Sequence, residues 1–159
     1  MTGHTLILLR HGKSDWSGGE PDHERGLTRR GRRQAADAGA WLADHATPDL
    51  AVMSTARRAV LTWRTAADEL PTAPTARTDE RVYAASARQL LEVVRGLPED
   101  PCTAVLVGHN PGLEDLVELL SGEVVRMPTS ALVVLDLDGA WAQVAAGSAT
   151  LRTSGRPPS

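Results

Sequence analysis

Two histidines, His11 and His109, each follow a short apolar run in this 159-residue chain. The runs, Leu6–Leu9 and Ala104–Val107, show no polar alternation, as expected for strands that are buried on both faces of a sheet. A third run of this kind covers Asp49–Met53. Because ligands of α/β proteins bind beyond the carboxyl ends of the parallel strands, we expect both histidines to face one pocket.

Arginines accompany these expected strand ends. Arg10 directly precedes His11, and Arg58 lies shortly after the third run, whereas we expect its neighbour Arg57 at the surface. A guanidinium group donates paired hydrogen bonds to a phosphate dianion and keeps its charge. Two such charges also lower the pKa of a nearby histidine, so that its imidazole stays neutral and can attack phosphorus. The residues therefore predict phosphoryl transfer without a metal.

The residues that follow the first histidine are further candidates for binding phosphate. Gly12 would let the backbone approach the anion closely, and Lys13 and Ser14 are weaker candidates. A helix expected from about Gly112 would add N-terminal amides and a favourable dipole. These residues do not form a P-loop, because that motif needs a glycine where Ile7 lies inside a strand.

A metal site is not expected among the histidines. The candidate ligands His11, His23 and His109 come without a cysteine pair or a His-x-x-x-His pattern, and the nearby arginines would repel a cation. His4 and His45 have no functional neighbours in the sequence. We therefore predict neither a metal nor a cofactor.

Three motifs, in this order, resemble those of the histidine phosphatase superfamily, also called the phosphoglycerate-mutase-like family. They are Leu8–Ser14, then Ser54 with Arg58-Ala59 and Thr62, and then Val107–Pro111. The short length, Lys13–Trp16 and Asp22–Arg25 are most similar to the SixA-type phosphohistidine phosphatases. The resemblance covers roughly Leu6 to Leu120, which is most of the chain.

The resemblance implies roles for the residues at the strand ends. His11 would be the nucleophile and would form a phosphohistidine intermediate that water hydrolyses. Arg10, Arg58 and His109 would hold the phosphate. Lys13 stands where mutase-like members commonly have Glu or Gln, which counts against a mutase.

The proton donor does not follow from the resemblance. Many superfamily members carry a glutamate before the third helix, and Asp79 or Glu80 could take that role, or neither could. A leaving group that is easily protonated, such as imidazole, would not need the donor. Thr55 and Gly26 stand where the family or its SixA-type members often have proline. Both positions are expected in loops, so these changes should not abolish the chemistry.

We predict a phosphatase that acts on protein phosphohistidine. The alternatives are a small-molecule phosphomonoesterase of the same fold and a module that binds phosphate or protein without turnover. Partners would be a phosphorylated protein or a small phosphorylated substrate. Specificity would reside in the loops over about 14–26 and 78–86, and few inserted loops predict an open pocket.

The pattern of strands and helices predicts an α/β three-layer sandwich. A mostly parallel central sheet would carry helices on both faces, with an antiparallel hairpin at the C-terminus. Helices are expected over about 28–45, 57–70, 86–95 and 112–120. The hairpin would pair strand 132–137 with strand 141–145 through a turn at Asp138-Gly139. We expect a single domain over 1–152 and a disordered tail over 153–159.

Composition excludes several classes of protein. With 17 basic and 20 acidic residues the net charge is -3, which argues against a nucleic-acid binder. No apolar run is long enough to span a membrane, and no signal peptide is evident.

The single cysteine, Cys102, favours a reducing compartment, so we predict a cytoplasmic monomer with a buried thiol. Four arginines within 29–33 form a solvated face or could steer a phosphorylated protein.

Overall fold

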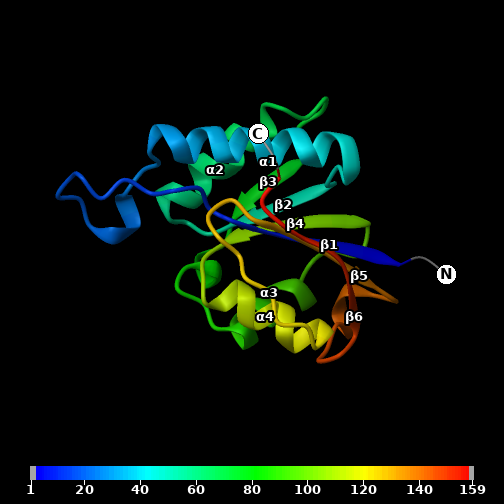
Figure 1. Ribbon diagram of the computed structural model, residues 1–159. Coiled ribbons are helices and arrows are strands. Elements are labelled where there is room, and N and C mark those ends of the chain that lie inside the picture. Colours follow the sequence, from blue (N-terminus) through cyan, green and yellow to red (C-terminus); the bar gives the residue numbers. More distant parts are fainter. Residues whose placement is uncertain (1–2, 158–159) are drawn as a thin grey trace.

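A six-stranded sheet with helices on both faces organises the computed structural model, which describes residues 3–157 (Figure 1). The strands lie in the order β3-β2-β4-β1-β5-β6. Their bounds are β1 His4–Arg10, β2 Leu50–Met53, β3 Thr75–Thr78, β4 Thr103–Gly108, β5 Leu132–Leu137 and β6 Ala149–Gly155. The first four are parallel, whereas β5 pairs antiparallel with β1, and β6 with β5. The predicted architecture is confirmed.

The helices divide between the two faces of the sheet (Figure 1). On one face lie α1 and α2, and on the other α3 and α4. Their bounds are α1 Arg29–His45, α2 Arg57–Ala67, α3 Ala87–Arg95 and α4 Gly112–Ser121. Thr28 caps α1 by accepting a hydrogen bond from the Gly31 N–H, and Ser86 and Gln89 form a capping box at α3. Short 3-10 turns occur at Asp22–Glu24, Glu80–Val82 and Trp141–Gln143.

The central strand β1 is buried on both faces, which explains its unbroken apolar run. Leu6 and Leu8 pack with α3 and α4, while Ile7 and Leu9 pack with α1 and α2, and all four are fully buried. With both faces covered, β1 is held rigidly, and so is the point at which it ends.

The C-terminal hairpin differs from the prediction. The return strand is β6, and the predicted strand 141–145 instead contains a 3-10 turn that buries Trp141. The prediction of a disordered tail is wrong for 153–155, because these residues pair with β5. The last predicted tail residues, Pro158 and Ser159, lie outside the described residues.

Two further features depart from the prediction. Strand β3 was not expected, because Thr75–Thr78 is exposed along its length and has no apolar run. Cys102 is exposed rather than buried. It precedes the interior strand β4 by one residue, and its N–H donates to Asp49 Oδ2 (3.1 Å), so it lies at the amino-terminal end of that strand.

Within residues 3–157, no helix is both long enough and apolar enough to cross a membrane.

Candidate active site

The strand register brings the ends of β1, β4 and β2 together. Arg10 is paired with Gly108, and Met53 with Val107. The residue after β1 still contacts the end of β4, because the His11 N–H donates to the Gly108 carbonyl oxygen (3.2 Å). The rings of His11 and His109 lie with their centroids 5.1 Å apart. The expectation that both histidines face one pocket is confirmed.

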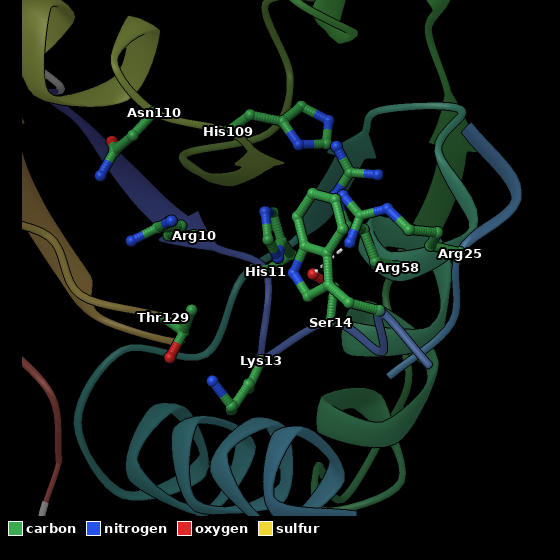
Figure 2. A pocket seen from close by; sticks show the side chains of 10 residues that line it. Arg10, His11, Lys13, Ser14, Arg25, Arg58, His109, Asn110 and Thr129 are labelled. Carbon is green, nitrogen blue, oxygen red and sulfur yellow. Dashed lines mark hydrogen bonds between the residues drawn. The ribbon is translucent and has the colours of Figure 1, made fainter. Parts of the chain in front are cut away.

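These strand ends border a cavity of about 340 Å³ (Figure 2). Its lining comprises Arg10, His11, Lys13, Ser14, Trp16, Arg25, Arg58, His109, Asn110 and Thr129. Of the residues predicted to attack or bind the phosphate, only Gly12 is not part of this lining. In Figure 2, His11 lies between Arg10 on one side and Arg25 and Arg58 on the other. Arg57 is exposed, as expected.

The hydrogen bond of His11 defines its tautomer. Nδ1 lies 2.7 Å from the Gly12 carbonyl oxygen, which can only accept, so Nδ1 carries the proton and Nε2 keeps its lone pair. The ring is 7% exposed. This burial, together with the charges of Arg58 and Arg10, lowers the pKa of His11 to about 4, although the bond to Gly12 opposes the shift. At neutral pH the side chain is an uncharged nucleophile.

The backbone of Gly12 is fixed from two sides. Its N–H donates to Thr62 Oγ1 (2.9 Å), and the Thr62 hydroxyl donates to the Arg58 carbonyl oxygen (2.7 Å). A Cβ on Gly12 would lie 2.5 Å from the Gly31 carbonyl oxygen. Only glycine therefore allows the loop after β1 to press against the start of α1, and this contact holds the Nδ1 acceptor of His11 in place.

His109 is held by the residue that follows β2. Its Nε2 lies 2.7 Å from Ser54 Oγ, and Ser54 is fully buried. Burial first, and then the neighbouring His11 and Arg58, lower the pKa of His109 to about 3. Ser54 Oγ already accepts from the Ala56 N–H (3.1 Å), and its own hydroxyl proton can be donated to Nε2. In that arrangement the neutral ring carries its proton on Nδ1, which is buried, has no hydrogen-bond partner among the described residues and can donate to a bound anion.

Asp22 links three side chains around the cavity. Its Oδ1 accepts from Arg25 Nη2 (2.7 Å), and its Oδ2 accepts from Arg58 Nη2 (3.2 Å) and from the Tyr83 hydroxyl (2.6 Å). Its carbonyl oxygen also accepts from Arg58 Nη1 (2.8 Å). The Tyr83 hydroxyl and then Arg25 hold the pKa of Asp22 well below its usual range. Asp22 is therefore a fixed negative charge that positions two arginines.

Arg25 is a site residue that sequence reasoning missed. It is 5% exposed, its Nη1 donates to Ser14 Oγ (2.8 Å), and its guanidinium carbon lies 3.3 Å from the centroid of the exposed Trp16 ring. Asp22–Arg25 was noted only as similar to SixA-type sequences. The signal was present in that motif, but nothing in the spacing shows that the segment folds back onto the cavity.

The charge of the cavity suits an anion. Arg10, Arg25 and Arg58 all line it, and the buried Nε of each has no hydrogen-bond partner among the described residues. No aspartate or glutamate belongs to the described lining. A phosphate dianion would meet three arginines and unpaired donors there, and the carboxylate of Asp22 lies behind Arg25 and Arg58, outside the lining.

Neither predicted candidate for the proton donor reaches the cavity. Asp79 caps a 3-10 turn and is ion-paired with Arg81 (2.6 Å), and Glu80 is exposed. His23, considered for a metal site, instead lies 2.8 Å from Thr55 Oγ1 through its Nε2. Among residues 3–157, no three His, Cys, Asp or Glu side chains gather as a metal site would require.

Sequence comparison identifies the family. The profile of the histidine phosphatase superfamily (branch 1) matches residues 6–107. The chain belongs to this superfamily. An uncharacterized protein of Mycobacterium tuberculosis is 34% identical to this chain over 155 residues. The match covers 90% of this chain and 96% of that protein.

Two solved structures place this histidine phosphatase within the superfamily. A protein of Nakamurella multipartitia, described as "putative phosphohistidine phosphatase SixA", matches with a TM-score of 0.88 and 28% identity over 100% of this chain and 99% of that one. One of Agrobacterium tumefaciens with the same description matches with a TM-score of 0.83 and 29% identity over 98% and 99%. The chain is thus a SixA-type member.

Proposed function

We propose that this protein is a metal-independent phosphatase in which His11 accepts the phosphoryl group. The Nε2 lone pair attacks phosphorus, the bond from phosphorus to the leaving group breaks, and the leaving group takes up a proton. Water then attacks the phosphohistidine and releases inorganic phosphate. The observation that carries the proposal is the bond from Nδ1 to the Gly12 carbonyl oxygen (2.7 Å) in a buried ring with a lowered pKa, because it leaves Nε2 unprotonated.

The neighbouring donors support the transferring group. Arg10 and Arg58 would balance the charge on its equatorial oxygens, and the unpartnered Nδ1 of His109 would donate to one of them. Arg25 lines the same cavity and would contribute a third positive charge. Lys13, Ser14 and the Gly12 backbone remain weaker phosphate-binding candidates.

The cavity lining favours phosphohistidine as the substrate. The alkoxide of an alkyl phosphate is a poor leaving group unless an acid protonates it, and no carboxyl group lies in the described lining. The imidazole of a phosphohistidine leaves readily because its nitrogen is easily protonated. The similarity to the two proteins described as "putative phosphohistidine phosphatase SixA" points the same way.

Trapping the intermediate tests the proposed mechanism. Acid quenching would destroy the label, so a turnover with labelled phosphohistidine protein should be quenched in base. Wild type should then carry base-stable, acid-labile label that His11→Ala lacks. If the two proteins carry equal label and neither releases phosphate, the chain is a binding module rather than an enzyme.

Adjacent arginines on α2 offer a matched pair of variants. Arg58→Gln removes a buried donor and should lower kcat by about 10² to 10³, whereas Arg57→Gln, on an exposed neighbour, should stay near wild type. Assaying phosphohistidine protein, an aryl phosphate and sugar phosphates side by side tests the substrate class. A large preference for a sugar phosphate would contradict phosphohistidine as the substrate.

A further inference from the structure

A cluster of exposed arginines lies beside the cavity without an evident structural role. We call it the α1 basic surface, formed by Arg29, Arg30, Arg32 and Arg33 at the start of α1 and by Arg156 after β6, all exposed. A helix N-terminus disfavours cations, and the first turn of α1 holds no acidic residue. None of these arginines joins an ion pair with another described residue. For the four arginines on α1, folding alone therefore gives no reason for this placement.

The α1 basic surface continues into the wall of the active-site cavity. Arg156 donates from Nε to the Thr129 carbonyl oxygen (3.0 Å), and Thr129 lines that cavity. Gln34 accepts from the Lys13 N–H (3.1 Å), which ties α1 to the loop after His11. A hollow of about 170 Å³ lies between these links and is lined by Arg30, Arg33, Gln34, Asp37 and Arg156. The arginines of this surface are thus joined to the cavity wall through Thr129 and Gln34.

The form of this surface fits a protein rather than a second small anion. All of its arginines are exposed rather than buried around one point, and Asp37 inside the hollow would repel a compact dianion. The chain as a whole carries a net charge of -3, so this local excess of positive charge would select for acidic surfaces.

Building on the proposed function, we infer that the α1 basic surface docks acidic side chains that flank the phosphorylated histidine of a protein substrate. Charge pairs of this exposed kind raise the association rate and help orient the partner, and they act outside the chemical step. The surface would therefore affect KM and kcat/KM for an acidic protein, but would leave kcat and the hydrolysis of small substrates unchanged.

Two phosphohistidine peptides that differ only in charge test the inference. Each has ten residues on either side of the phosphohistidine, with glutamates in one and glutamines in the other. Wild type should show a kcat/KM about tenfold higher for the glutamate peptide at low salt, and the preference should shrink as salt screens the charges. In Arg30→Gln/Arg33→Gln the preference should fall close to unity through KM, with aryl phosphate hydrolysis unchanged.

A matched double variant on the other face of the sheet serves as the control. Arg88→Gln/Arg95→Gln removes two exposed arginines from α3 and should keep the full preference. The inference is wrong if Arg30→Gln/Arg33→Gln still prefers the glutamate peptide, or if it loses rate equally on both peptides and on the aryl phosphate. It is also wrong if that variant loses only binding to phosphatidylglycerol vesicles.

Binding of the unphosphorylated glutamate peptide separates this inference from the proposed function. If wild type hydrolyses the aryl phosphate and neither peptide, the proposed substrate fails. The docking inference is then decided by whether Arg30→Gln/Arg33→Gln weakens peptide binding several-fold, as expected, or leaves it unchanged, which would refute it.

Discussion

His11 can act as a nucleophile because its surroundings hold one of its two neutral tautomers. The Gly12 carbonyl oxygen accepts a hydrogen bond from Nδ1–H, and burial among arginines keeps the ring uncharged. The ring is therefore already neutral with a free lone pair on Nε2, so the site needs no separate base to activate the histidine.

The two histidines of the cavity should titrate far below an ordinary histidine. NMR titration of the ring protons should give pKa values of about 4 for His11 and about 3 for His109. A bound tungstate or phosphate dianion should raise both, because a negative charge favours the protonated ring. A midpoint near 6.5 for His11 in the free protein would contradict the proposed site.

The same depressed pKa values have a consequence for stability. In the unfolded chain these histidines take up protons near pH 6.5, whereas the folded protein resists protonation. The free energy of unfolding should therefore fall as the pH drops from about 6.5 toward 4. Urea titrations at several pH values should show this loss, and His11→Asn should reduce it.

Asp22 should act as a positioning residue. Asp22→Asn keeps the shape but removes the charge that holds Arg25 and Arg58, so kcat/KM should fall by about 10- to 100-fold. Because Asp22 raises the pKa of His109, the substitution should also lower that pKa further, which NMR can measure. Tyr83→Phe, which removes a single hydrogen bond to Asp22, should have the smaller effect on both quantities. Equal effects of both variants would contradict the positioning role.

Sequence reasoning found the residues at the strand ends and missed those that arrive from the loops. His11, His109, Arg10 and Arg58 follow from apolar runs that end at a common edge. Arg25, which lines the cavity, reaches it through a fold of the 14–26 segment that no periodicity describes. The roles of these residues in turnover stay predictions.

At the scale of elements, the start of α1 and the loop after β1 form one unit. A Cβ on Gly31 would lie 2.2 Å from the Lys13 carbonyl oxygen. This oxygen is a backbone atom, so it cannot move away without displacing the chain around it. Gly31→Ala should therefore displace either α1 or the loop that carries Gly12.

We expect Gly31→Ala to destabilise the protein by about 1–3 kcal/mol and to lower kcat as well, because the acceptor for His11 Nδ1 would shift. Thermal unfolding and steady-state kinetics measure the two effects. Gly19→Ala, where a Cβ would contact nothing within 4 Å, is the control. An unchanged kcat in a clearly destabilised Gly31→Ala protein would show that the loop moves independently of α1.

Buried elements were predictable and exposed ones were not. Helix α1 was expected from its Thr28 cap and its apolar face, and the structure confirms it. Strand β3 carries no such signal, since it lies at an edge with exposed polar residues. The return strand was misplaced because Trp141 reads as an apolar strand residue, whereas it fills the core from a 3-10 turn.

For the whole molecule, residues 153–155 belong to the sheet rather than to a tail. Removing residues 153–159 deletes the part of β6 that pairs with Leu132, Val133 and Val134, and also Arg156 with its contacts to Thr129. We expect the melting temperature to fall by several degrees or more. A chain that ends at Pro157 should melt like the full-length protein, and equal melting of both truncations would show that this part of β6 contributes nothing.

The strand order also bears on when the site can exist. β1 is made first, yet its neighbours in the sheet are β4 and β5, and Leu9 pairs with Val107 and Leu132. The cavity needs Thr129 as well as His11. During synthesis on the ribosome, His11 must therefore wait for most of the chain to emerge, and such distant pairings form slowly. A nascent chain that stops short of Thr129 and β5 would carry the nucleophile without a pocket, so activity would begin only after these residues have emerged.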